Sequence, residues 1–395
     1  MKRLVLLVFV ALPARAADFQ FEGYGDFRLV MAPKTEPMLD GGLGKLRFGE
    51  DDGGLEPGDI VGEGRVIIVP ELTATATTRI NPDYGLAVDL IESYVRYRPV
   101  STTDLRWSVK VGAFFPPISL ENDQIGWSSF WTLTPSAINS WIGDELRIIG
   151  AEGTLEWRRA SGDITVKGAV FGWNDPAGVV IADRGWDMSD RIQGLFDHTR
   201  LPDAAAFRGA PPVFANLFTE MDDTPGWYLD LSWEPAEIAG FEVMRYDNQA
   251  DPKVVKGGQV AWHTSFWDIG FQKQIGKLTL LSQGMSGATT IAPSPFFHQT
   301  TDFRSAYALA GYDMDKVWLA ARYEVFQTRT RASFPSDLNE DGQALTLSLS
   351  WLPKTWLRFT GELIAMDDRR DERAAEGEDP HRNETQFQLL ARVYF

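Results

Sequence analysis

The last nine residues of the chain, FQLLARVYF at 387–395, alternate between two kinds of side chain. One series is apolar: Phe387, Leu389, Ala391, Val393 and Phe395. The positions between them include Gln388, Arg392 and Tyr394. Successive side chains of a β-strand point to opposite faces, and this pattern fits a wall with hydrocarbon on one side and water on the other. The sequence therefore predicts that the chain ends on a strand of a transmembrane barrel.

The N-terminus has the composition of an export signal. A basic start at Lys2 and Arg3 precedes an apolar run, and a small-residue sequence follows that ends at Ala16. This order is typical of a cleaved secretory signal peptide. We therefore predict a signal peptide at 1–16 and a mature outer-membrane β-barrel domain at 17–395.

The composition limits how the mature chain can be built. Hydrophobic residues make up 44% of the chain, but no run of about 20 apolar residues follows the signal peptide, so no transmembrane helix is expected. The absence of cysteine suits passage through an oxidising periplasm. The net charge is −17, and cleavage removes Lys2, Arg3 and Arg15, which gives −17 − 3 = −20. A chain this acidic is not expected to bind nucleic acid.

Segments with a period of two residues recur along the mature chain, and their connections are alternately short and long. For example, Leu105–Phe114 follows a short turn at 99–104 and precedes a long connection at 115–146. Transmembrane barrels have short periplasmic turns and long extracellular loops. We predict an all-β fold, a closed antiparallel transmembrane β-barrel of about 16 strands, with 14 or 18 strands as alternatives. Further long outer loops are expected at 31–63, 174–226 and 286–302.

Three of the expected strands end in the pattern aromatic-x-Pro, at Tyr97, Trp233 and Trp351. An outward aromatic ring suits the membrane interface, and proline stops the ladder where a tight turn begins. Five more outward aromatic residues fall at the same level: Trp107, Trp157, Phe241, Phe271 and Phe395. The pattern predicts an aromatic girdle on the periplasmic side.

The inward positions of these strands carry charges of both signs. The basic residues are Arg96, Arg98, Arg106, Lys110, Arg158, Lys167, Arg322, Arg358 and Arg392. The acidic residues are Glu92, Glu152, Glu156, Asp230, Glu234, Glu324 and Glu362. Removing so many charges from water would cost several kcal/mol each, and a barrel of this size can hold water. We expect these side chains to line a largely water-filled lumen, with structural ion pairs across the wall as the alternative role.

In this architecture the chain resembles the 16-stranded porins of Gram-negative outer membranes, and its last strand resembles the C-terminal assembly signal of outer-membrane barrels. The segment VKVGAFFPPISLEN at 109–122 is similar to the strand-to-loop passage of phosphate-selective porins. Those porins carry a ladder of basic residues, whereas the lumen expected here mixes both signs. The resemblance implies an outer-membrane channel for passive diffusion of small hydrophilic solutes or ions.

In general porins the third outer loop folds into the barrel and narrows it, and the corresponding segment here is 115–146. Its residues Glu121 and Asp123 would then lie across the pore from basic residues on the wall: Arg96, Arg98, Arg106 and Lys110. Such an arrangement would create a transverse field at the constriction. The alternative is that this loop packs as a lid outside the lumen.

Local signals within 115–146 suit an inward fold. Thr134 followed by Pro135 is typical of a helix N-cap and first helical residue, so we predict a short helix at Ser136–Ile142. Large apolar residues could anchor the segment to the inner wall: Trp127, Phe130, Trp131, Ile138 and Trp141.

The sequence DLNEDG at 337–342 places Asp337, Asn339 and Asp341 at the first, third and fifth positions of a calcium loop. The twelfth position is Ser348, so the bidentate glutamate of an EF-hand is missing. A weak calcium site and a solvated turn are the two interpretations. No other cofactor is expected.

Other functions leave weaker traces in the sequence. The four histidines form no convincing constellation with a nucleophile, so an enzyme is not expected. The alternatives to a porin are a selective or hydrophobic-solute transporter and a non-conducting adhesin or structural barrel. The expected partners are outer-membrane lipid and lipopolysaccharide, the outer-membrane assembly machinery and small hydrophilic solutes. A monomer and a homotrimer are not distinguished.

Overall fold

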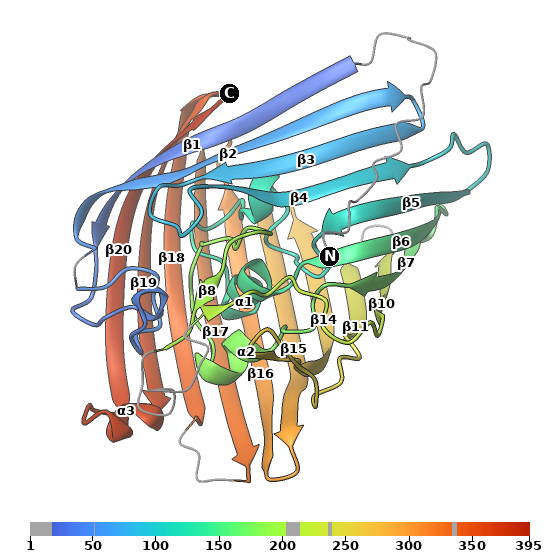
Figure 1. Cartoon of the computed structure of the whole chain (residues 1–395). Helices are drawn as coiled ribbons and strands as arrows, with labels where there is room; N and C mark the ends of the chain where they lie inside the picture. Colours follow the sequence, from blue (N-terminus) through green and yellow to red (C-terminus); the bar gives the residue numbers. More distant parts are fainter. Residues whose placement is uncertain (1–17, 51, 203–213, 236–238, 334–337) are drawn as a thin grey trace.

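A computed structural model describes residues 18–50, 52–202, 214–235, 239–333 and 338–395, so the predicted signal peptide lies outside the described residues. The chain forms a closed antiparallel barrel of sixteen strands, which confirms the predicted fold and strand number (Figure 1). Neighbouring strands are joined in chain order, and the last strand pairs with the first. At this closure Gly23 and Phe395 exchange two backbone hydrogen bonds of 2.9 and 3.0 Å.

The first eight barrel strands are β1 (Asp18–Met31), β2 (Gly54–Val69), β3 (Leu72–Ile80), β4 (Val88–Tyr97), β5 (Leu105–Phe114), β6 (Ile148–Trp157), β7 (Gly162–Gly172) and β10 (Gly226–Pro235). The other eight are β11 (Gly240–Asp247), β14 (His263–Ile275), β15 (Leu278–Ser294), β16 (Phe297–Asp313), β17 (Val317–Ala332), β18 (Glu340–Lys354), β19 (Leu357–Arg370) and β20 (His381–Tyr394). Two small hairpins lie in the outer loops: β8 (Thr199–Arg200) with β9 (Phe214–Ala215), and β12 (Val255–Lys256) with β13 (Gln259–Val260).

Strand β5 illustrates why these sequences form the wall. Its residues Leu105, Trp107 and Val111 are 43%, 44% and 53% exposed on the outer face, whereas Ser108 and Lys110 alternate with them and point inward. The period of two therefore sorts apolar side chains to the membrane side and polar ones to the lumen.

The predicted aromatic girdle is present at the short-turn end of the barrel. Tyr97 lies 5.7 Å from Trp107 between ring centroids, and Trp233 lies 5.9 Å from Phe241. These rings are all exposed, as expected for side chains at the lipid–water boundary.

The barrel wall is uneven in height. Strands β14 to β20 have 13–17 residues, whereas the barrel strands β3 to β7, β10 and β11 have 8–11, and Figure 1 shows the long strands extending beyond the short ones. The predicted outer loop at 286–302 is therefore wrong, because β15 and β16 continue through it to a tight turn at 295–296. Similarly, β2 begins at Gly54 within the loop predicted at 31–63. Beyond the membrane both faces of a strand are polar, so the alternation on which the prediction depends disappears.

The described helices are short: η1 (Met38–Asp40), η2 (Ile125–Trp127), α1 (Ala137–Glu145), α2 (Val179–Asp183) and α3 (Glu372–Ala375). Among the described residues, no helix has the length and apolar character needed to cross a membrane.

Candidate functional site

The segment 115–147, here called the inner loop, folds into the barrel, and α1 lies within the ring of strands (Figure 1). Every residue of α1 is buried. The predicted helix is confirmed, but its N-cap is Ser136 rather than Thr134, because the Ser136 side chain accepts a hydrogen bond from the Asn139 N–H. Thr134 instead donates its N–H to Glu362 on the wall. The lid outside the lumen is therefore not the arrangement of this loop.

Arg322 of β17 is the central anchor of the inner loop. Its guanidinium donates to the carbonyls of Thr134 and Pro135 at 2.9 Å each, and it pairs with Glu121 at 3.1 Å and Glu324 at 2.9 Å. All three charged side chains are completely shielded from solvent. One guanidinium therefore holds the loop before α1 against the wall.

Two wall carboxylates receive the backbone of the same loop. Glu324 accepts the Ala137 N–H at 2.7 Å, at the first turn of α1. Glu362 of β19 accepts the N–H groups of Leu133 and Thr134 at 2.6 and 3.1 Å. Negative charge at these free N–H groups is favourable because the N-terminus of a helix carries partial positive charge.

The expectation that water solvates the inward charges is wrong for this part of the wall. Arg322, Glu324, Arg358 and Glu362 point inward as predicted, but all four are buried. The inner loop supplies their partners, and Arg358, for example, donates to the Phe130 carbonyl at 2.7 Å. Charge in the lumen can thus be compensated by a folded-in loop as well as by water.

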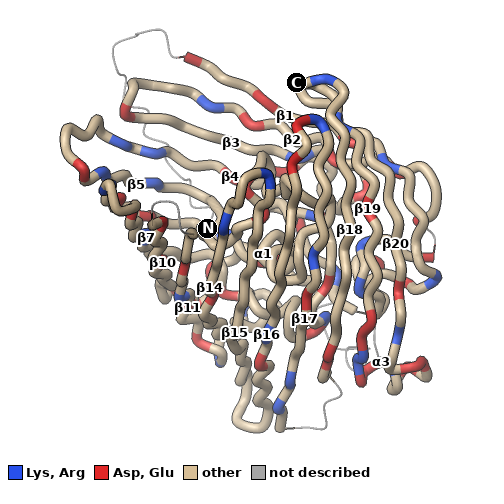
Figure 2. Tube along the Cα trace, turned by 180° about the vertical axis from the view of Figure 1, so that it is seen from behind, with Lys and Arg blue, Asp and Glu red and all other residues tan. Residues whose placement is uncertain are grey.

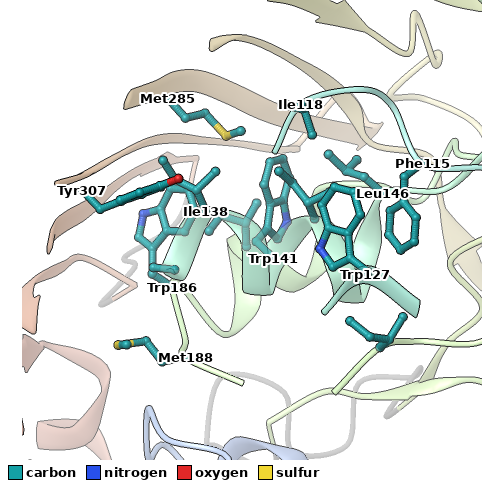
Figure 3. Packing of buried hydrophobic residues seen from close by; sticks show 14 of the residues in the cluster. Phe115, Ile118, Trp127, Ile138, Trp141, Leu146, Trp186, Met188, Met285 and Tyr307 are labelled. Carbon is teal, nitrogen blue, oxygen red and sulfur yellow. The ribbon is translucent and has the colours of Figure 1, made fainter. Parts of the chain in front are cut away.

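Aromatic rings fill the space between the inner loop and the tall wall, as Figure 3 shows for the residues around α1. The Trp141 ring lies 5.1 Å from Phe303 and 5.6 Å from Phe266 on the wall, and 6.0 Å from Trp186 of the next inner segment. Trp127 stacks on Phe115 at 4.0 Å. The predicted anchoring to the wall is confirmed for Trp141, whereas the ring of Trp127 stacks within the inner loop.

A second segment, 173–202, packs against the inner loop and carries α2. Glu145, at the end of α1, accepts the N–H groups of Gly178 and Val180 at 2.7 and 2.9 Å, and the Trp141 indole N–H also donates to it. A single carboxylate thus joins α1 to the first turn of α2.

Burial raises the pKa of Glu145 from 4.5 to about 7, although the N–H donors around it oppose the shift. A carboxyl group of this kind stabilises the fold fully below its unfolded pKa, and the contribution is lost as the pH rises through about 7. At 1.36 kcal/mol per pH unit the effect is about 3 kcal/mol. Difference infrared titration should show one carboxyl group that deprotonates near pH 7 in the wild type and is missing in Glu145→Gln. If the wild type and Glu145→Gln titrate identically, the carboxyl group that deprotonates near pH 7 is not Glu145.

Asp190 ties the second segment to strand β1 of the barrel. Its carboxylate pairs with Arg28 of β1 at 2.9 Å and with Arg47 at 2.6 Å. Burial acts to raise the pKa of Asp190, but the two guanidinium groups lower it below the ordinary value. Asp190 therefore stays charged through the neutral range.

The space between the inner loop and the wall has a wide part and a narrow part. The wide part is a cavity of ≈ 400 Å³ lined by Glu63, Arg65, Glu92 and Lys110 of the wall and by the inner loop at 115–127. The narrow part has a volume of only ≈ 20 Å³, which is room for about one water molecule. Both parts are lined by Gly126 and Trp127.

The narrow part, here called the gap, lies between strands β1 to β4 and β20 on one side and the inner loop and residues 190–192 on the other. Its charged lining residues are Asp26, Asp59, Arg79, Asp190 and Arg392. They form tight pairs: Arg392 binds Asp26 through two bonds of 2.8 Å, and Asp59 accepts the Asn81 amide at 2.6 Å. Opposite charges therefore lie side by side on the strands that line the gap.

The expected pore residues occupy several different places. Lys110 lines the wide cavity and pairs with Glu152 at 3.1 Å, and Arg98 pairs with Glu156 at 3.7 Å. Lys167 pairs with Asp230 at 3.4 Å. Further residues at these levels are Arg96, which donates to Ser108, and Arg106, whose register partner is Glu156.

Glu121 and Asp123 separate in the structure. Asp123 is exposed and lines the wide cavity. Glu121 is 1% exposed and bound to Arg322, so it lies beneath the inner loop rather than at its pore edge. The predicted transverse field between Glu121 and the basic residues of β4 and β5 is wrong, because Glu121 pairs with Arg322 on β17.

Of the five charged residues that line the gap, only Arg392 was among the predicted pore residues. Asp26 and Arg79 alternate with exposed neighbours and were missed although their inward phase was available, whereas Asp59 lies in the segment 31–63 that was predicted to be a loop. Asp190 was missed because it belongs to a long loop.

Two of the three expected calcium ligands, and one further cluster of acidic residues, lie in the described part of the chain. Asp337 lies outside the described residues, Asn339 accepts the Thr330 N–H at 3.0 Å, and Asp341 pairs with Arg329 at 2.7 Å. Calcium binding there stays a prediction. In the described part of the chain, Asp175, Glu220 and Asp222 are close enough to share a cation.

Comparison with known proteins gives a match in fold. No protein-family model and no curated protein sequence matches the chain. An anion-selective porin from Comamonas acidovorans is 11% identical, with a TM-score of 0.57 over 96% of this chain and 100% of that one. The outer membrane channel DcaP of Acinetobacter baumannii is 8% identical, with a TM-score of 0.57 over 98% of this chain and 100% of that one.

A loop-deletion mutant of OmpT, an outer membrane protein of Vibrio cholerae, is 12% identical, with a TM-score of 0.56 over 96% of this chain and 100% of that one. At such identities the likeness shows the fold alone. The chain therefore has the fold of outer-membrane porins.

Proposed function

We propose that the protein is an outer-membrane porin that lets ions and small hydrophilic solutes diffuse through the gap beside its inner loop. The observation that carries the proposal is a pair of adjoining charged cavities, one of ≈ 400 Å³ and the gap of ≈ 20 Å³, with carboxylates and guanidiniums on the lining of the gap. Apolar side chains such as Val61 and Leu133 share the lining, but the five charged groups favour ions and polar solutes over apolar ones. Water molecules and ions that enter the gap would replace their contacts with bulk water by hydrogen bonds and ion pairs with these groups.

The narrowness of the gap sets the class of solute. A volume of ≈ 20 Å³ admits about one water molecule at a time. Solutes as large as sugars would require the inner loop to move, whereas ions that shed part of their hydration shell could pass. We therefore propose a channel of small conductance.

Planar bilayer recording of the purified protein tests the proposal. We expect stepwise currents that are small for a barrel of sixteen strands and that rise with salt concentration. Replacing Gly126 by valine should reduce the steps, because a Cβ at this residue would meet the Val61 side chain at 2.6 Å beside the gap. Insertion without steps would instead favour a structural or adhesive barrel.

The location and partners belong to the same proposal. Porin-like neighbours and the outward apolar belt support a place in the outer membrane, reached through the assembly machinery by way of the C-terminal strand. No catalytic role is proposed. Mass measurement in detergent distinguishes a monomer from a homotrimer.

A further inference from the structure

A groove of ≈ 780 Å³ lies on the outer face of the barrel over β14 to β18. Its floor consists of small residues: Ser282, Gly284 and Ser286 of β15 and Ala306 of β16. The register places these residues on the membrane side, because Gly284 pairs with Ile269, which is 62% exposed, and with Ala306. Figure 2 shows this wall from outside, with β15 and β16 uncharged over most of their length.

Large side chains form the sides of the groove. Trp267 and Ile269 of β14 stand along one side, and Val325 of β17 stands along the other. Between them the floor is open, since a Cβ built on Gly284 would meet only Ala306 Cβ at 3.8 Å. From Ser282 to Ser286 the groove runs for about 13 Å along the strand. Its shape suits a narrow, extended apolar chain.

One end of the groove carries the cation Arg304 and, on β18, the carboxylate of Asp341, which pairs with Arg329 at 2.7 Å. Ser286 pairs with Arg304 in the register, and Arg304 pairs with Gln327, so the three lie side by side across β15 to β17. Arg304 is exposed and, among the described residues, makes no hydrogen bond or ion pair. By contrast, Arg329 and Arg331 on β17 pair with Asp341 and Asp302.

Arg304 lies at the long-loop edge of the apolar belt. On β16 the outward residues from Arg304 towards the girdle are Ala306, Ala308 and Ala310, followed by Tyr312, which is exposed. The cation therefore lies where the headgroups of the outer leaflet meet the acyl region, provided that the barrel has the outer-membrane location proposed above. A phosphate at this level could accept charge-assisted hydrogen bonds from the guanidinium.

We propose that this groove is a binding site for a phosphate-bearing lipid of the outer leaflet. One acyl chain lies along Gly284 and Ala306, and the phosphate binds Arg304. A second copy of the chain fits less well, because its apolar belt would leave the Arg304 charge without a partner. Because the groove and the cation adjoin, the site selects a ligand that has both an acyl chain and a phosphate.

Native mass spectrometry of the detergent-purified barrel with bisphosphorylated lipid A tests the proposal. The wild type should retain one lipid. Arg304→Gln should weaken binding roughly tenfold, as expected for the loss of a charge-assisted hydrogen bond. Gly284→Leu fills the groove and should abolish retention. The measurement needs no ion conduction, so it can succeed or fail independently of the porin proposal.

Matched control variants distinguish lipid binding at the groove from nonspecific lipid binding to the barrel surface. Arg331→Gln removes an outward charge from the neighbouring strand, and Gly153→Leu makes the same glycine change on the outer face of β6, where open space surrounds the residue. Both should bind lipid A as the wild type does. Equal retention by Arg304→Gln and Gly284→Leu, equal retention of lipid A lacking its phosphates, or a dimer of the chain that Gly284→Leu disperses would each overturn the proposal.

Discussion

Arg322→Ala is expected to release the inner loop from the wall and to raise the single-channel conductance several-fold. The variant leaves Glu121 and Glu324 buried without their cation and removes the donors to the Thr134 and Pro135 carbonyls. Removal of one partner from a buried pair costs about 3–5 kcal/mol. At about 1.4 kcal/mol per tenfold change, the docked state of the loop would lose a factor of more than about a hundred in its equilibrium. The sixteen-stranded wall keeps its backbone hydrogen bonds, so the barrel should remain closed.

Bilayer conductance and limited proteolysis of the inner loop would measure this release. Arg322→Lys keeps the charge but not the planar fork that reaches two carbonyls and two carboxylates, so its effect should be intermediate. Arg331→Ala is the control, since its pair with Asp302 is exposed to solvent and contributes little to stability. Wild-type conductance together with wild-type protease resistance in Arg322→Ala would contradict the anchoring role.

Asp190→Asn is expected to shift the selectivity of the channel towards anions. The gap lining contains three carboxylates and two guanidiniums, and the substitution removes one carboxylate without changing side-chain size. Arg28 and Arg47 then lose their shared counter-charge. The Debye length is about 8 Å at physiological salt, so charges at the gap should act on passing ions more than charges in the outer loops do.

Reversal potentials in a tenfold salt gradient would measure this shift. Ideal selectivity corresponds to about 59 mV per tenfold ratio, and a shift on the order of 10–20 mV is expected for Asp190→Asn. Arg79→Gln, on the opposite side of the gap, should shift the potential in the other direction. Asp341→Asn changes a charge on the outer face and should have no effect. If both gap variants match the wild type, ions pass by another route.

The wall was predictable from sequence because its determinants are local. Outward exposure of Leu105 and Trp107, and the proline two residues after three of the girdle residues, depend on neighbours within one strand. The interior was predictable only in outline. The pairing of Glu121 with Arg322 spans 201 positions, and that of Arg28 with Asp190 spans 162. No pattern within a strand indicates which of several inward charges a folded loop will reach.

The helix of the inner loop shows both sides of this limit. The predicted cap at Thr134 and the observed cap at Ser136 differ by two residues, and both residues are typical of N-caps. Glu362 accepts the Thr134 N–H, and Arg322 binds the Thr134 and Pro135 carbonyls, so the wall moves the start of the helix. Local propensity thus predicts that a helix forms, whereas tertiary contacts decide where it begins.

The positions of the loop anchors along the chain also constrain biogenesis. The inner loop precedes β6, but its partners on β17 and β19 follow 187 to 229 residues later. The wall closes only when Phe395 reaches Gly23. Contacts of such separation form late because the connecting chain must first be ordered. During folding the inner loop therefore stays undocked until β17 and β19 are in place, so the interior packs at about the same stage as β1 and β20 pair.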